Sequence, residues 1–331
     1  MTILFVSGIN DLSTVGITLD DKGQVGYLMD GNASVQHRMS LGDREATAFL
    51  IFGMGVKQHS AHFKKPPAVI FNQIADPDTH HGALQRCVEL CDQLDTRVIN
   101  HPRKILQTSR DQVSQALQGI DGIIVPRTQR FQPHSPNEVF SRAAAEGFEL
   151  PFILRVAGLH GGVSMVKVDS RDDHAALHVL PFDGRDFYLT EFIDYKSPDG
   201  LYRKTRIALV DGVPLIRHHL IDSSWMVHAS ALALMDQQPA LMDEANSVLA
   251  DFDGTLRPAI EDRLSEITRR LGLDYYGIDC HINQQGELLI FEANANMNIL
   301  YNSRKEYEQC VGVIKNHILA MIDDRCHQVT H

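Results

Sequence analysis

The stretch Gly277-Ile-Asp-Cys-His-Ile-Asn-Gln-Gln-Gly-Glu-Leu-Leu-Ile-Phe-Glu-Ala-Asn294 predicts a β-hairpin that carries three oxygen-bearing side chains. Side chains alternate along a strand, so Glu292 and Asn294 share one face, and Asp279 lies opposite them if the strands pair directly. Glu292 interrupts an apolar run, where a buried carboxylate must be paired or metal-bound. Carboxylate and amide oxygens suit Mg²⁺, so the hairpin predicts a divalent-metal site. The alternative is an ordinary solvated hairpin face.

Outside this hairpin, short apolar runs alternate with helical stretches, a pattern typical of an α/β fold with a mostly parallel sheet in its first half. A second hairpin is predicted across Asp211-Gly212. Strands are predicted at 3–7, 68–74, 97–100, 122–125, 152–156, 163–168, 187–193, 203–210, 213–220, 276–282 and 287–293. Helices are predicted at 83–94, 105–117, 136–146, over most of 225–271, and at 304–322.

The composition excludes several classes of protein. The 331 residues include 31 Lys and Arg against 42 Asp and Glu, a formal charge of −11, which disfavours nucleic-acid and anionic-membrane partners. Five scattered cysteines predict free thiols rather than a disulfide framework or a zinc site. The N-terminus has no basic region, and its apolar run is too short for a signal peptide or a membrane span. We therefore expect a cytoplasmic protein that does not bind membranes or nucleic acid.

The hairpin's order of Asp, glycine turn and Glu-x-Asn resembles the metal site of the ATP-grasp superfamily, which includes bacterial glutathione synthetase and D-alanine–D-alanine ligase. Other motifs follow in the family's order over about residues 98–298, which makes the resemblance specific although each motif alone is weak. They are Val98–Pro102 with Thr108–Asp111, Gly122–Thr128, Pro151–Arg155, Gly158–Gly162, Tyr188–Ile193, and Asp199-Gly200 with Arg206.

The resemblance implies roles for individual residues. Arg206 and Arg155 are the implied catalytic residues, and Arg206 would stabilise the transferring phosphoryl group. Arg110 and Arg155 stand where Lys is usual for phosphate contact, and Arg can bind phosphate bidentately. The remaining implied nucleotide contacts are the glycine-loop residues His160, Gly161 and Gly162, the adenine hinge Glu191, Phe192 and Ile193, and Asp199. The implied metal ligands are Asp279, Glu292 and Asn294.

The resemblance also implies an architecture and an activity. We expect a pre-ATP-grasp α/β domain at 1–100, a linking helical region at 101–124, a small lobe at 125–195 and a C-terminal lobe at 196–331. The implied activity is an ATP- and Mg²⁺-dependent carboxylate–amine ligase, with two metal ions and Mn²⁺ as an alternative metal. It would form an acyl phosphate and release ADP and phosphate. The substrates would be a small-molecule carboxylate and amine, such as an amino acid or peptide, and a homodimer is an option. An ATP-grasp small-molecule kinase and a non-catalytic ATP-binding protein are the alternatives.

Asp251-Phe-Asp-Gly-Thr255 matches the motif of haloacid-dehalogenase phosphatases. That family needs the motif at the end of its first strand with a domain's length of chain after it, and too little chain follows here. We therefore predict a turn, in which Thr255 or Asp253 caps the next helix.

Two other regions are candidates for the acceptor site. The loop at 76–82 follows a strand end, where open α/β sheets bind ligands, although it also reads as a capped turn. In the 217–271 stretch, side chains that could reach a substrate pocket are His218, His219, Trp225 and His228.

Overall fold

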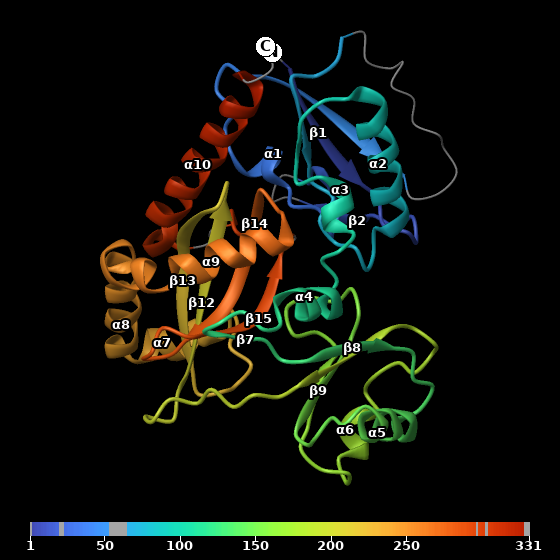
Figure 1. Ribbon diagram of the computed structural model, residues 1–331, viewed down its shortest axis with the longest axis vertical. Helices are drawn as coiled ribbons and strands as arrows, with labels where there is room; N and C mark the ends of the chain where they lie inside the picture. Colours follow the sequence, from blue (N-terminus) through green and yellow to red (C-terminus); the bar gives the residue numbers. More distant parts are fainter. Residues whose placement is uncertain (1, 20–22, 53–64, 296, 302–303, 328–331) are drawn as a thin grey trace.

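The structure is a computed structural model that describes residues 2–19, 23–52, 65–295, 297–301 and 304–327 (Figure 1). Its N-terminal domain contains a parallel sheet in the order β4-β1-β5-β6. The helix α2 packs on this sheet with the buried side chains of Leu84, Cys87 and Leu90. The bounds are β1 Thr2–Gly8, β4 Glu45–Ile51, β5 Val69–Asn72, α2 His81–Leu94 and β6 Val98–Ile99.

The small lobe is an antiparallel sheet in the order β10-β9-β11-β8, with α5 and α6 beside it. It has its own apolar core, which includes Phe140, Phe152 and Leu189. Ser135 caps α5, since its hydroxyl accepts a hydrogen bond from the Glu138 amide at 3.3 Å. The bounds are β8 Thr128–Phe131, α5 Pro136–Ala145, β9 Phe152–Val156, β10 Met165–Val168, α6 His174–Leu177 and β11 Phe187–Glu191.

The C-terminal lobe is built on a sheet in the order β13-β12-β14-β15-β7. Both predicted hairpins are present, and Asp211 and Gly212 have the positive φ angles, 51° and 79°, of the turn expected there. The strand bounds are β7 Ile123–Ile124, β12 Tyr202–Val210, β13 Val213–Asp222, β14 Tyr275–Ile282 and β15 Leu288–Asn294. The helix bounds are α7 Ala231–Gln237, α8 Pro239–Ala250, α9 Arg257–Leu271 and α10 Glu308–His327.

The N-terminal domain and the C-terminal lobe share their apolar cores. One cluster joins Val6 and Ile70 to Ile278, and another joins Phe5 and Phe71 to Tyr275 and to side chains of α10. Among the described residues, the small lobe contributes no buried residue to either cluster, so fewer apolar contacts fix its position. No helix in the described part of the chain is long and apolar enough to cross a bilayer.

Two sequence predictions differ from the structure: the single helix at 105–117 and the helix cap at residue 253 or 255. The helix predicted at 105–117 is two helices, α3 (Pro102–Ile105) and α4 (Arg110–Leu117). The Thr108 hydroxyl donates a hydrogen bond to the Ile105 carbonyl, which ends the first helix, and the second helix begins after Ser109. The motif at Asp251–Thr255 lies in a π-helical turn, Phe252–Leu256, between two helices rather than at a strand end, so the phosphatase alternative loses its structural context.

In that turn the Thr255 hydroxyl bonds to Asp251, and no side chain caps α9, so the predicted cap was wrong. Several elements were not predicted at all: β2 (Gly16–Leu19), β3 (Val25–Leu28), α1 (Val35–Arg38), β4, β8 and α6.

Candidate active site

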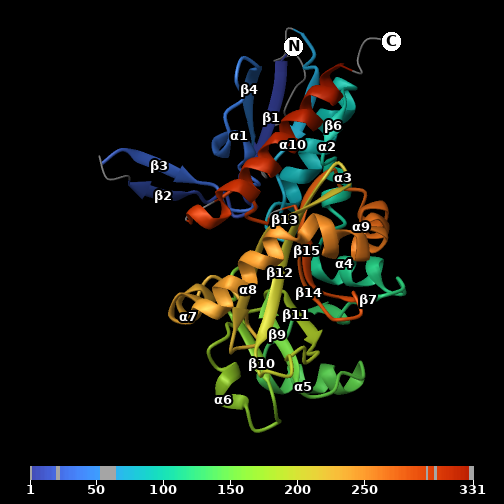
Figure 2. The ribbon, with the colours of Figure 1, turned by 90° about the vertical axis from the view of Figure 1, so that its left-hand side faces the viewer.

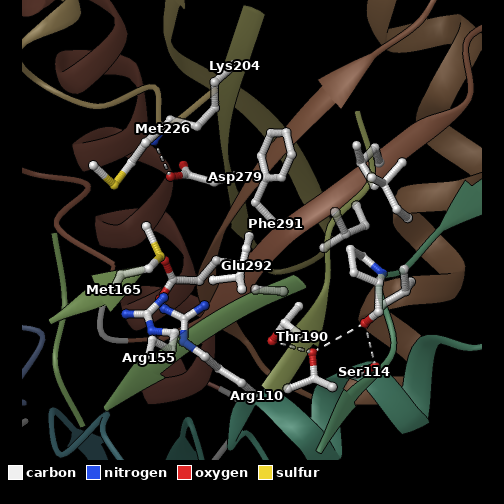
Figure 3. Close-up of a pocket in the computed structure, with 18 of the residues that line it drawn as sticks. Arg110, Ser114, Arg155, Met165, Thr190, Lys204, Met226, Asp279, Phe291 and Glu292 are labelled. Atoms are coloured by element: carbon white, nitrogen blue, oxygen red, sulfur yellow. Dashed lines mark hydrogen bonds and ion pairs between the residues drawn. The ribbon is translucent and has the colours of Figure 1, made fainter. Parts of the chain in front are cut away.

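A cavity of about 260 Å³ lies between the small lobe and the C-terminal lobe (Figure 3). The strands β9 to β11 and the hinge after β11 form one wall, and β12, β14 and β15 form the other. The helix α4 closes one end. The charged residues that line the cavity are Arg110, Arg155, Glu191, Lys204, Arg206, Asp279 and Glu292.

The register of the β14–β15 hairpin brings the three predicted metal ligands together. Asp279 pairs directly with Glu292, and Gly277 pairs with Asn294. The register shifts just after Asp279, where Cys280 pairs with Ile290. All three predicted ligands line the cavity, as strand alternation predicted.

Asp279 is bound by two cations from the neighbouring strand β12. Arg206 donates from Nε to Oδ1 at 2.7 Å and from Nη2 to Oδ2 at 2.9 Å, and Lys204 Nζ lies 3.0 Å from Oδ2. The Asp279 side chain is only 5% exposed. Burial alone would raise the pKa of Asp279, but the charges of Arg206 and Lys204 hold it well below its ordinary value. Asp279 is therefore an ionised, buried carboxylate.

Glu292 is bound by two groups from other parts of the chain and by Asn294 of its own strand. Arg110 Nη2 on α4 lies 2.5 Å from Oε1, His160 Nδ1 lies 3.7 Å from the same oxygen, and Asn294 donates to it at 2.6 Å. Burial would raise the pKa of Glu292, but the charges of Arg110 and His160 lower it well below its ordinary value. This second carboxylate is therefore also ionised.

The residues present fit a divalent cation. The Oδ1 atom of Asn294 is buried and has no hydrogen-bond partner among the described residues. A buried amide oxygen without a donor is costly, and a cation held between it and the carboxylates of Glu292 and Asp279 would satisfy it. The metal roles of these three residues remain a prediction.

Arg155 on β9 adds a second guanidinium beside Arg110, and both side chains point toward Glu292 in Figure 3. Arg155 is buried, donates from Nη2 to the Leu159 carbonyl, and has no partner for Nε within the described chain. Burial, followed by the charge of Arg110, lowers the pKa of Arg155 to about 9. Two adjacent guanidinium groups, of which Arg155 is buried and Arg110 partly exposed, repel each other, so an anion bound between them would be favoured.

The other end of the cavity is lined mostly by apolar side chains. Phe192 packs edge-on against Trp225, with ring centroids 5.6 Å apart. The Glu191 carboxylate accepts from the main chain and Nε of Arg127, both at 3.0 Å, so its side chain is engaged outside the cavity. The apolar lining residues here include Val125, Ile153, Ile193, Leu289 and Ile290. Such a slot suits a planar, largely apolar ring.

The glycine loop at 158–162 connects the cavity to the N-terminal domain. Gly161 and Gly162 line the cavity. His160 bridges two carboxylates, with Nε2 at 3.0 Å from Asp76 and Nδ1 at 3.7 Å from Glu292. Burial would lower the pKa of His160, but the Asp76 and Glu292 carboxylates raise it to about 9. The candidate loop at 76–82 therefore reaches the edge of the site.

Asp78, a second aspartate of the 76–82 loop, forms further hydrogen bonds to the small lobe. Asp78 accepts hydrogen bonds from Tyr188 Oη at 2.7 Å, Arg130 Nη1 at 2.9 Å and the Gly158 amide at 3.3 Å. Tyr188 and Arg130 lie on β11 and β8. These contacts hold the small lobe and its glycine loop against the N-terminal domain.

Some predicted residues lie elsewhere. Asp199 does not line the cavity: its carboxylate is exposed and accepts from Arg203 at 2.7 Å, because the turn before β12 carries it to the surface. Trp225 and His228 line the cavity, whereas His218 and His219 do not. The His219 ring is buried in β13 and bonds to the Thr205 hydroxyl at 2.8 Å.

Sequence reasoning missed one charged residue of the cavity, Lys204. It precedes Arg206 by two positions on β12, so both side chains face Asp279. That spacing was the signal that could have identified it. The other lining residues that were not predicted are mostly apolar and include Met165, Tyr195, Met226 and Phe291.

No protein-family model matches the chain, and no curated protein matches its sequence. Solved structures do match its fold over nearly the full length. The D-alanine–D-alanine ligase from Bacillus anthracis is 12% identical with a TM-score of 0.55, covering 99% of this chain and 98% of that one. The VanG D-Ala:D-Ser ligase from Enterococcus faecalis is 11% identical with a TM-score of 0.57, covering 98% and 99%. A RimK domain ATP-grasp protein from Sphaerobacter thermophilus is 14% identical with a TM-score of 0.52, covering 99% and 100%. The chain therefore has the ATP-grasp fold that its motifs predicted.

Proposed function

We propose that the protein is an ATP- and Mg²⁺-dependent ligase that joins a small-molecule carboxylate to an amine, and that an amino acid or peptide is one of its substrates. The observation that carries this proposal is the convergence of four cations and two ionised carboxylates on one cavity. The cations are Arg110, Arg155, Lys204 and Arg206. Solved proteins with the same fold include several ligases, one of them in complex with ATP.

The cavity suggests how the nucleotide would bind. Adenine would lie in the apolar slot beside Phe192, and the triphosphate would extend toward Arg110 and Arg155 under the glycine loop. Asp279, Glu292 and Asn294 would hold Mg²⁺, which neutralises phosphate charge when bound. Lys204 and Arg206, held in place by Asp279, would present their positive charge to the phosphates from the C-terminal lobe.

The proposed reaction has two steps. A substrate carboxylate oxygen attacks the γ-phosphorus, the bond to the β,γ-bridging oxygen breaks, and ADP leaves an acyl phosphate. The amine nitrogen then attacks the acyl carbon, inorganic phosphate leaves, and the nitrogen loses a proton. The chain supplies no covalent nucleophile in this scheme. Arg206 and Arg155 act by holding the reacting groups and stabilising negative charge.

Thermal unfolding with and without Mg·ATP tests the nucleotide site. A ligand at 100 times its Kd should stabilise the wild type by about 2.7 kcal/mol. Glu292→Ala should lose most of this shift. Asp253→Asn is a matched control, because Asp253 is an exposed carboxylate that does not line the cavity and belongs to the phosphatase-like motif. It should keep the full shift. If neither ATP nor Mg·ATP stabilises the folded wild type, the nucleotide assignment is wrong.

Product analysis then tests the reaction. Pools of carboxylic acids and amines are incubated with Mg·ATP, and ADP, phosphate and new masses are measured. Equal amounts of ADP and free phosphate together with an amide support the ligase. ADP with a phosphorylated metabolite and no free phosphate would show a kinase instead. ATP binding without ADP release in any pool would favour a non-catalytic ATP-binding protein.

A further inference from the structure

The strands β2 and β3 form a ribbon that projects from the N-terminal domain (Figure 2). Within the described chain these two strands pair only with each other. Nearly every residue of the ribbon is exposed, including its large apolar side chains. A two-stranded ribbon is at best marginally stable in water unless something packs on it.

The register assigns the apolar side chains to one face. Ile17 pairs with Tyr27, and Leu19 pairs with Val25. Directly opposed residues point to the same side, and residues two apart on a strand do as well. These four residues therefore form one surface, here called the ribbon's apolar face. They are 71%, 72%, 69% and 58% exposed in the order named.

The opposite face is quite different. Thr18 pairs with Gly26, and Gly16 pairs with Leu28, so two of the four positions on this side are glycines and Leu28, 49% exposed, is its one large apolar residue. This side is here called the bare face. A ribbon that simply faced water would show no such division into an apolar and a bare side. The division indicates that the apolar face packs against something.

We propose that the apolar face is a dimer interface, in which the ribbons of two copies stack face to face across a two-fold axis. The face is uncharged and presents the same side chains to a copy of itself, as an isologous interface requires. An uncharged contact also lets two chains of net charge −11 meet without like charges at the centre of the interface. Two stacked sheets lie about 10 Å apart, with side chains of this kind packed between them.

The available area fits a weak dimer. At these exposures the four side chains present roughly 500 Å² per copy, so stacking would bury about 1,000 Å² in total. That is the lower limit for a specific interface, so we expect a dimer with a Kd in the micromolar range.

Sedimentation velocity over a range of micromolar concentrations tests the proposal. The wild type should shift from monomer to dimer, and Tyr27→Ser should raise the Kd at least 10-fold. Thr18→Ala, on the bare face, should behave as wild type. Unchanged unfolding temperature and an unchanged response to Mg·ATP show that Tyr27→Ser is folded. A wild type that stays monomeric throughout, or a dimer that Tyr27→Ser does not weaken, overturns the proposal.

Cross-linking with a short bismaleimide reagent tests the geometry. Ile17→Cys places a thiol on the apolar face, and Thr18→Cys places one on the bare face of the same strand. Only Ile17→Cys should give a covalent dimer above the wild-type background, since four of the five native thiols are buried. Equal cross-linking of both variants contradicts face-to-face stacking. Co-sedimentation of a monomeric wild type with phosphatidylcholine vesicles, lost in Tyr27→Ser, would assign the face to lipid instead.

Discussion

Two carboxylates face each other across one hairpin, yet their counter-charges come from different places. Asp279 is bound by Lys204 and Arg206, which both lie on the adjacent strand of the same sheet. Glu292 is bound by Arg110 from α4 and lies near His160 of the small lobe's glycine loop. The Asp279 cluster is therefore complete once the sheet has formed, whereas the Glu292 cluster depends on how three parts of the chain are placed.

The difference continues beyond the direct contacts. His160 reaches on to Asp76, and Asp78 of the same loop holds Tyr188, Arg130 and Gly158. The small lobe has a separate apolar core, so polar contacts of this kind determine much of its position. We infer that the Asp279 cluster is the rigid side of the site and the Glu292 cluster the side that adjusts when the lobes move. The predictions that follow test this contrast.

Asp279→Asn should cause the largest loss of stability. It leaves Lys204 and Arg206 as uncompensated, largely buried charges, which costs about 3–5 kcal/mol when one partner of a buried pair is removed. Denaturant unfolding of the free protein measures this loss. Asp199→Asn, which removes an exposed carboxylate from Arg203 on the same strand, is the matched control and should cost about 0–1 kcal/mol. Equal losses in the two variants would contradict the rigid role of the Asp279 cluster.

Glu292→Gln should affect the reaction more than the fold. It removes a carboxylate that orders the groups around the phosphates, and the expected loss in ADP formation is about 100- to 1,000-fold. Its stability should fall less than that of Asp279→Asn, because Arg110 and Glu292 are each about one fifth exposed, at 19% and 22%. Steady-state kinetics measures the loss of ADP formation, and denaturant unfolding of the same preparations measures the loss of stability.

The comparison for Glu292→Gln is Asp279→Asn itself. If the two variants lose the same stability and the same activity, the two clusters are equivalent and the contrast fails. If Glu292→Gln retains full activity, Glu292 holds neither metal nor phosphate-binding groups in place.

The two clusters also differ in how far the sequence could predict them. Strand alternation was sufficient to place Asp279 opposite Glu292, and the same rule applied to β12 would have added Lys204. No local pattern connects Asp76 to His160. They are 84 positions apart and meet only because the small lobe packs against the N-terminal domain. The fold was predictable where apolar runs and turn residues were clear, as at Asp211-Gly212.

Elsewhere the fold was not predictable from local patterns. The strand β4 lies at a sheet edge and is largely exposed, so it lacks the apolar run that marks a buried strand. The ribbon of β2 and β3 contains glycines at positions 16 and 26, which obscure its alternation. Arg110 was expected to contact phosphate, and its ion pair with Glu292 depends on the placement of α4, which sequence spacing does not encode.

Asp78→Asn should weaken nucleotide binding by a smaller factor. The amide cannot accept all the donors that Asp78 now holds, so the small lobe and its glycine loop lose part of their hold on the N-terminal domain. We expect the KM for ATP to rise about 10-fold, which corresponds to about 1.4 kcal/mol, with a smaller change in kcat. Asp183→Asn, which breaks an exposed pair with Arg185 in the small lobe, should leave both constants unchanged. A drop in kcat with unchanged KM would argue against a role in lobe placement.

The smallest expected effect is a pH dependence due to His160. Its pKa is raised to about 9 in the folded protein, above the ordinary value near 6.5, so its stabilising contribution is full below pH 6.5 and is lost as the pH rises through 9. The side chain is 42% exposed, so solvent screens the interaction and the contribution should stay below about 1 kcal/mol. Without nucleotide or metal, His160→Gln should therefore be less stable than wild type at pH 6 and nearly equal to it at pH 9.5. In an Asp76→Asn background, His160→Gln should lower the stability at pH 6 by less, because the carboxylate nearest to the His160 ring is gone. A difference between His160→Gln and wild type that is constant across this range would mean that packing, not charge, holds His160 between the two domains.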